Sequence, residues 1–143
     1  MSLRSQIRTI AVVCALPLTL RAQSPAPRID PSVQSVVSGG RWTAGKATGS
    51  LRVIEIAEGW ENVRYRVFVQ WLEDTEDGAR IRTSRDLGPL VPNQFSLTNP
   101  QLVYKAGSWR VDLKAASRPM ERPERPLSFV VGAPGQVTLV DPR

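Results

Sequence analysis

The chain of 143 residues contains no histidine and a single cysteine, Cys14, and these absences remove much of the chemistry that catalytic sites use. Without histidine, no side chain of the chain titrates near neutral pH in its unperturbed form, and no imidazole is present as a general base or metal ligand. A lone cysteine forms no disulfide within the chain, so stability depends on packing. The composition therefore predicts a protein that is not an enzyme and holds no cofactor.

Long hydrophobic runs are also scarce. The most apolar run, residues 10–20, has about eleven residues, whereas a membrane-spanning helix needs about twenty. It follows two arginines and precedes Ala22 and a polar stretch, which is the layout of a secretory signal peptide. We therefore predict a signal peptide over residues 1–22, whose cleavage would also remove Cys14. The mature chain is expected to be periplasmic or secreted, without a transmembrane span.

The positive charge of the chain is partly contributed by the predicted signal peptide. The 19 basic and 13 acidic residues give a net charge of +6, and removal of the three arginines in residues 1–22 lowers it to +3. A charge of this size affects solubility more than the choice of partner. We therefore expect no nucleic-acid partner.

The remaining sequence predicts one domain after a short leader. Residues 23–31 contain three prolines without periodicity and are predicted to form a flexible Pro-rich leader. Residues 32–143 form a domain that is long enough to bury a core without disulfides. Within it, residues 117–126 (SRPMERPERP) are predicted to be an extended loop insert, because their prolines disfavour helix and central strand.

Alternation of apolar and polar residues predicts β-strands along most of this domain. The strongest alternation covers residues 63–72, which are therefore predicted to form a central strand with one apolar face: Val63, Tyr65, Val67, Val69 and Trp71. No segment shows a sustained helical period. Seven to nine short strands separated by Gly, Pro and Asn predict an all-β fold, a single antiparallel β-sandwich of immunoglobulin-like or fibronectin-like type.

Several segments of the predicted sandwich are irregular. Residues 51–57 carry apolar side chains in both phases, which leaves open a strand covered on both faces or a β-bulge. Gly39 and Gly40 are predicted to interrupt the chain, and Asn99-Pro100 to separate two short strands. Polar residues 79–86 follow a turn and are predicted to form an edge strand.

The turn before this edge strand is acidic. Glu73, Asp74, Glu76 and Asp77 resemble the carboxylates of a calcium site, but their spacing matches no established calcium loop. A solvated hairpin turn with Asp77-Gly78 at its tip explains the same residues. We therefore expect no metal site here.

Two tryptophans and four arginines are the candidate binding residues. Trp60 and Trp42 lie beside predicted turns, where an exposed indole would anchor a partner; the alternative is that they fold back onto the core. The arginines recur on consecutive predicted strands and would share a face that suits an anionic ligand; the alternative is a solvated face of ion pairs. These arginines are Arg64, Arg66, Arg80 and Arg82.

Taken together, the sequence predicts an exported, non-catalytic binding module that contacts another protein of the cell envelope. The contact would use strand addition along the edge strand at residues 79–86, or an aromatic anchor at Trp60. The alternative is recognition of an anionic glycan or other polyanion by the arginine face and the exposed tryptophans.

Overall fold

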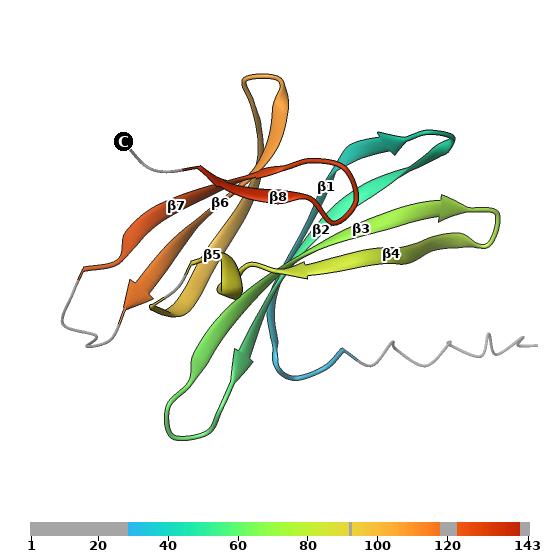
Figure 1. Ribbon diagram of the computed structural model, residues 1–143. Coiled ribbons are helices and arrows are strands. Elements are labelled where there is room, and N and C mark those ends of the chain that lie inside the picture. The colour runs from blue at the N-terminus through green and yellow to red at the C-terminus, as the bar shows by residue number, and fades with distance from the viewer. Residues whose placement is uncertain (1–28, 92, 118–122, 141–143) are drawn as a thin grey trace, which may run out of the picture.

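The computed structural model describes residues 29–91, 93–117 and 123–140, which form eight strands and one short 3-10 helix (Figure 1). The predicted signal peptide and residues 23–28 of the predicted leader lie outside this part of the chain. The elements are β1 (Val33–Ala44), β2 (Ala47–Glu58), β3 (Arg64–Thr75), β4 (Gly78–Asp86), η1 (Gly88–Leu90), β5 (Gln94–Lys105), β6 (Ser108–Ser117), β7 (Arg125–Val131) and β8 (Val137–Val140). No helix among the described residues has the length and apolarity to cross a membrane.

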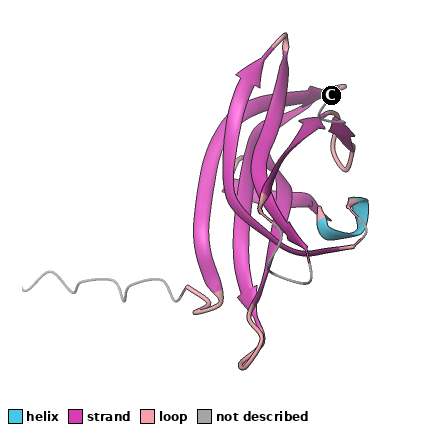
Figure 2. Ribbon diagram, turned by 90° about the vertical axis from the view of Figure 1, so that its left-hand side faces the viewer, coloured by secondary structure: helices cyan, strands magenta, loops and turns pink. Residues whose placement is uncertain are grey.

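The strands form two antiparallel sheets of four. Sheet A has the order β1-β2-β3-β4 and sheet B the order β5-β6-β7-β8, so that β4 is an edge strand and β3 is internal, as the sequence predicts. Turns join neighbouring strands within sheet A, and in sheet B they join β5 to β6 and β7 to β8. The chain passes from one sheet to the other through the segment with η1, cyan in Figure 2. The all-β, antiparallel prediction is confirmed.

The strand order of the two sheets differs from that of an immunoglobulin sandwich. In immunoglobulin domains, strands A, B, E and D share one sheet and C, F and G the other, so the chain crosses between the sheets repeatedly. Here the four strands of each sheet are consecutive in the chain. The structure therefore supports two packed antiparallel sheets and gives no support for the immunoglobulin-like or fibronectin-like strand order.

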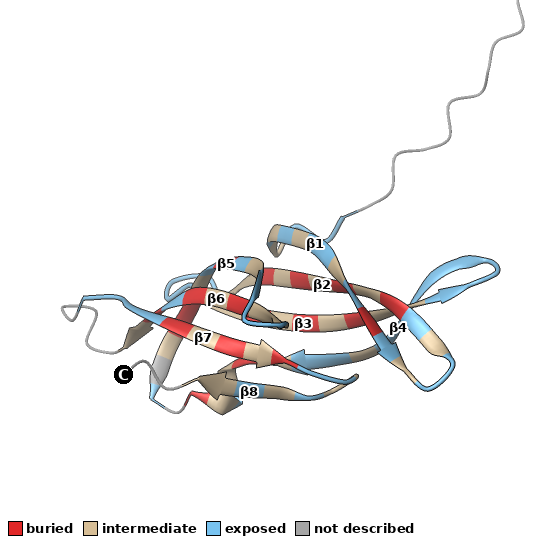
Figure 3. Ribbon diagram, turned by 90° about the horizontal axis from the view of Figure 1, so that it is seen from above, coloured by how far each residue is buried: buried red, intermediate tan, exposed pale blue. Residues whose placement is uncertain are grey.

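The core lies between the two sheets, and alternation along the strands selects its residues. Figure 3 shows buried positions alternating with partly buried ones along β2 and β3. Val67, Val69 and Trp71 of β3 are buried as predicted, and each such side chain contributes about 1.5–3 kcal/mol through removal from water. They pack in one cluster with inward-facing residues of both sheets, among them Leu51, Val53, Val111, Leu113 and Phe129.

The prediction that the apolar face of β3 begins at Val63 is wrong. Val63 precedes the strand and is 39% exposed, and Tyr65 is only partly buried. The β2–β3 hairpin, at the bottom of Figure 1, extends beyond the core at this point. Tyr65 lies at the margin of the core, where its amide donates to Oγ of Ser96 on β5 and the residue borders a surface cleft.

The irregular pattern of β2 has no bulge in its ladder with β3. The register runs without a shift from Gly49 opposite Glu73 to Glu58 opposite Arg64. Leu51 and Val53 face the core, whereas Ile54 and Ile56 lie on the outer face and are partly buried. Of the two interpretations left open by the sequence, the β-bulge is not observed in this ladder, and the outer face of β2 is partly buried.

Two predicted breaks are bulges within continuous strands. β1 runs through Gly39 and Gly40, and its register with β2 shifts between Gly39 and Arg41. β5 runs through Asn99 and Pro100, where its register with β6 shifts. A positive φ at Gly40 (68°) and at Asn99 (54°) bends the backbone without ending the strand.

The predicted loop insert at residues 117–126 is shorter than expected at its ends. β6 extends through Ser117, and β7 begins at Arg125 and includes Pro126, which pairs with Lys114. Pro126 is tolerated there because β8 pairs with β7 only from Ser128 onward, so no strand on that side needs an amide donor from residue 126. Residues 118–122 lie outside the described residues.

Candidate functional site

The six predicted site residues lie at opposite ends of sheet A. Trp60, Arg64 and Arg66 belong to the β2–β3 hairpin. The second group is at the other end, where the β1–β2 and β3–β4 hairpins lie (Figure 1), and consists of Trp42, Arg80 and Arg82. The strands are antiparallel and joined by hairpins, so these two groups cannot form one arginine face.

Trp60 is the most exposed large hydrophobic residue in the described part of the chain. It lies in the turn between β2 and β3, and 95% of its surface is accessible to solvent. The preceding Gly59 has a φ of 98°, and a Cβ added there would lie 2.8 Å from the carbonyl oxygen of Asn62. The tight turn therefore depends on Gly59. The alternative in which Trp60 folds back onto the sandwich is not observed.

A chain of ion pairs joins the base of this hairpin to the end of β4. The Glu58 carboxylate accepts hydrogen bonds from Nη2 of Arg64 at 2.9 Å and from Nη1 of Arg66 at 2.6 Å. The other terminal nitrogen of Arg66, Nη2, donates to Oδ2 of Asp86. The Arg66 guanidinium also lies 4.8 Å from the centre of the Phe68 ring, a cation–π distance. Arg66 is therefore held on three sides, whereas Arg64 is half-exposed.

The same contacts shift the pKa of two of these groups. Hydrogen bonds from Arg64 and then Arg66 lower the pKa of the Glu58 carboxyl, because they stabilise its charged form. The hydrogen bond to Asp86, followed by that to Glu58, raises the pKa of the Arg66 guanidinium. Both shifts keep the pairs ionised at neutral pH.

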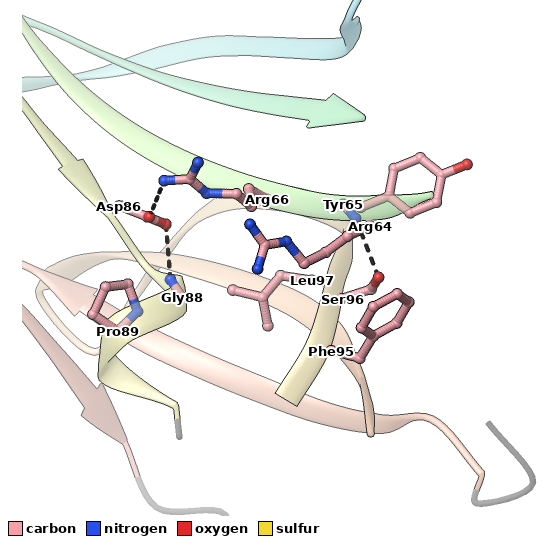
Figure 4. A pocket seen from close by; sticks show the side chains of 9 residues that line it. All are labelled: Arg64, Tyr65, Arg66, Asp86, Gly88, Pro89, Phe95, Ser96 and Leu97. Atoms are coloured by element: carbon pink, nitrogen blue, oxygen red, sulfur yellow. Dashed lines mark hydrogen bonds and ion pairs between the residues drawn. The ribbon is translucent and has the colours of Figure 1, made fainter. Parts of the chain in front are cut away.

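Beside these ion pairs lies a cleft of about 320 Å³, shown in Figure 4. Its wall is held by two hydrogen bonds: the Tyr65 amide donates to Oγ of Ser96 at 3.1 Å, and the Gly88 amide donates to Oδ1 of Asp86 at 2.9 Å. The cleft thus joins β3, the crossover and β5, which are distant in the sequence. It is lined by Arg64, Tyr65, Arg66, Asp86, Gly88, Pro89, Phe95, Ser96 and Leu97.

Trp42, at the opposite end, is a core residue and not a surface contact. Only 6% of it is exposed, and its Nε1 donates to the carbonyl oxygens of Ser50 and Leu72, both at 3.1 Å. The guanidinium of Arg82 covers the indole at 5.5 Å from the ring centre. Of the two alternatives that the sequence left open for Trp42, the indole folded onto the core is the one observed, because the bulge in β1 turns the residue onto the inner face of sheet A. Trp42 therefore does not offer the exposed indole that a binding residue would need.

Two arginines of β4 and one of β1 form ion pairs with Glu73 and Asp74, which precede the acidic turn. Glu73 accepts from Arg80 at 3.0 Å and from Arg82 at 3.3 Å, and Asp74 pairs with Arg41 at 2.8 Å. Within residues 29–91, 93–117 and 123–140, no group of three acidic, His or Cys side chains converges to hold a metal ion. All four predicted arginines are thus in ion pairs, which is the alternative that the sequence left open.

Tyr104 is exposed and was not singled out by the sequence pattern. It lies on β5 directly opposite Trp109 of β6, and 63% of it is accessible to solvent. The signal for this pair is present in the sequence, since two aromatic residues flank the turn at residues 105–108 symmetrically. Only the strand register shows that they meet.

Comparison with protein-family models, with curated proteins and with solved structures found no match to this chain.

Proposed function

We propose that this protein is an exported, non-catalytic binding module that contacts another protein of the cell envelope through its β2–β3 hairpin. The exposure of Trp60 is the observation that carries the proposal. An indole that is 95% accessible contributes nothing to the packing of its own core and offers a large apolar surface to a partner. Tryptophan is among the residues that contribute most to binding when buried at the centre of an interface.

The base of the hairpin supports the same role. Glu58 and Asp86 hold Arg66 between them, so the strands that carry Trp60 are fixed before a partner binds. Less conformational freedom is then lost on association. The half-exposed Arg64 lies next to the cleft and supplies a hydrogen-bond donor at the rim of the proposed interface.

The edge strand β4 is a second surface for the same function. Its outer backbone edge is unpaired within the described residues, which suits strand addition by a partner. However, Arg80, Arg82 and Arg85 lie on this strand, and charged side chains on an edge strand discourage pairing with further strands. The hairpin is therefore the better-supported contact.

Recognition of an anionic glycan or polyanion by the arginines has less support. Each of Arg64, Arg66, Arg80 and Arg82 already has a carboxylate partner. A polyanion would have to compete with those carboxylates. Such binding would also weaken steeply with ionic strength, whereas a contact centred on Trp60 would not.

Site-specific photo-crosslinking in the organism that makes the protein tests the proposal. Benzoylphenylalanine in place of Trp60 is expected to give one discrete protein adduct, and benzoylphenylalanine in place of the exposed Lys46, at the opposite end of sheet A, none. A third variant carries benzoylphenylalanine in place of the exposed Ile81 on β4. An adduct formed from position 81 alone would mean that the partner contacts the edge strand and not the hairpin. Equal adducts from positions 60 and 46, or none from either, would contradict the proposal.

The identified partner then allows a quantitative test. Trp60→Ala is expected to weaken binding at least tenfold, because truncation of a central tryptophan removes about 2 kcal/mol or more of binding free energy. Binding that is unchanged by Trp60→Ala but lost above moderate salt would favour the polyanion-type contact instead.

A further inference from the structure

A second cleft, of about 410 Å³, lies between sheets A and B near the β5–β6 hairpin. Its volume falls within the range of small-molecule sites, about 300–1,000 Å³. It joins the end of β1 to the β5–β6 hairpin and to the turn after β7, and Trp60 is at the other end of sheet A. Its lining includes Arg41, Thr43, Tyr104, Ser108 and Trp109.

Two aromatic rings form one wall of this aromatic cleft. The centres of the Tyr104 and Trp109 rings are 5.1 Å apart and the ring planes are tilted by 58°. Trp109 is held in place from behind, because a Cβ added at Gly40 would lie 2.9 Å from two atoms of its indole. Tyr104 rests against this fixed ring and remains 63% exposed. The pair is a positioned aromatic platform with an accessible surface.

Polar groups at the rim supply both donors and acceptors. Nη2 of Arg41 donates to Asp74 at 2.8 Å, which leaves other guanidinium donors of this exposed side chain available. Oγ of Ser108 donates to the carbonyl oxygen of Lys105 at 3.2 Å and so retains its capacity to accept. Thr43 adds a further hydroxyl.

The charge balance of the aromatic cleft favours an uncharged ligand. Arg41 is the charged residue among those that line it in the described part of the chain, and Asp74 compensates its charge. Among the residues that the structure describes, no carboxylate lines the cleft to attract a cation, and no uncompensated cation lines it to attract an anion.

We propose that the aromatic cleft binds a sugar ring of a neutral oligosaccharide, stacked on Tyr104. A pyranose ring has an apolar face of C–H groups, which matches an exposed aromatic ring, and hydroxyls at its edge that both donate and accept hydrogen bonds. The fixed Trp109, the rim of hydroxyl groups and the compensated Arg41 match these requirements together. A proline-rich peptide would also use aromatic rings, but it offers mainly acceptors and leaves the accepting groups of the rim unused.

Isothermal titration calorimetry of the protein with three uncharged probes tests this site: the hexamers of β-1,4-linked glucose, xylose and N-acetylglucosamine. Saturable binding of at least one hexamer is expected, with an affinity that changes less than twofold between low and moderate salt. Tyr104→Ala is expected to weaken it at least tenfold, whereas Tyr104→Phe retains most of it. A Tyr104→Ala protein with an unchanged melting temperature shows that loss of binding is not loss of folding.

Trp60→Ala is the matched control, because it removes an exposed aromatic residue far from the aromatic cleft. It is expected to leave oligosaccharide binding unchanged. The test of the aromatic cleft is therefore independent of the test of the proposed protein contact. Failure of all three hexamers to bind, binding that survives Tyr104→Ala, or tighter binding of a proline hexamer than of any sugar would overturn the inference.

Discussion

At the residue scale, two glycines leave room for two of the four tryptophans, Trp109 and Trp42. Gly40 leaves space for the indole of Trp109 behind the aromatic cleft. Gly49 has a different constraint, because a Cβ there would lie 1.7 Å from the carbonyl oxygen of Leu72, the same oxygen that accepts from Trp42. Because glycine has no side chain, neighbouring groups approach the backbone at these two positions more closely than any other residue would allow.

Gly40→Ala is expected to lower the free energy of unfolding by about 2–4 kcal/mol, combining the cost of a positive φ with overpacking against Trp109. Gly45→Ala is the matched control, since Gly45 has a φ of 62° but no atom within 4 Å of an added Cβ, and it is expected to cost about 1–2 kcal/mol. Urea denaturation of both variants measures the difference. Equal losses would show that the contact between Gly40 and Trp109 contributes nothing.

At the element scale, the β2–β3 hairpin combines an exposed tip with a strongly paired base. Trp60 and its turn have little tertiary packing, whereas Glu58, Arg64 and Arg66 cross-link the two strands below it. Ion pairs at exposed positions contribute modestly to stability, but here they share one carboxylate and continue to Asp86. Their effect is to orient the hairpin, which is what a binding loop requires.

The lowered pKa of Glu58 predicts a pH dependence for this base. A carboxyl whose folded pKa is below its ordinary value of 4.5 stabilises the fold above that value, and the stabilisation is lost as pH falls through the folded pKa. Glu58→Gln should therefore be less stable than the unaltered protein at neutral pH, and the two stabilities should converge in acid. Urea unfolding at several pH values checks this.

Glu61→Gln is the control for that comparison. Glu61 is an exposed carboxylate in the same hairpin and makes no ion pair within the part of the chain that the structure describes. Its loss is expected to leave the pH dependence of stability unchanged. A difference between Glu58→Gln and the unaltered protein that persists unchanged into acid would mean that the ion pairs are not its cause.

At the scale of the whole molecule, the two sheets are held together by a single apolar core. Trp71 of β3 is fully buried, and its Nε1 donates to the carbonyl oxygen of Gly132, beyond β7, at 3.2 Å. This bond joins sheet A to sheet B. Leu51 and Val69 of sheet A belong to the same buried cluster as Val111 and Phe129 of sheet B. Cohesion therefore depends on the inward faces of both sheets at once.

Val67→Asp is expected to abolish cooperative folding, because an unpaired buried charge costs several kcal/mol against a total stability of about 5–15 kcal/mol. Gln70→Asp places the same side chain on the outer face of the same strand. In the unaltered protein, Oε1 of Gln70 accepts from Nε and Nη2 of Arg52 at 2.9 and 2.7 Å. An aspartate at position 70 also offers an oxygen acceptor to Arg52, so only a small change in stability is expected. Thermal melts followed by circular dichroism distinguish the two; a cooperative melt for Val67→Asp would contradict the assigned core.

Prediction from the sequence succeeded where a feature is local. The alternation in β3, the hairpin closed by residues 73–78 and the polar edge strand β4 were all predictable, because side-chain period and turn chemistry depend on neighbouring residues. At Gly40 and Asn99 the sequence predicts breaks where the structure has bulges, since the same residue types suit both and only pairing with the next strand distinguishes them.

The sequence by itself thus determined the all-β class, the inward face of β3 and the absence of histidine chemistry. The tertiary structure alone decided the strand order, the burial of Trp42, the exposure of Trp60 and the meeting of Tyr104 with Trp109. The physical reason is that burial and pairing depend on segments distant in the chain. A local sequence pattern indicates which face of a strand is apolar, but it does not indicate which other segment covers that face.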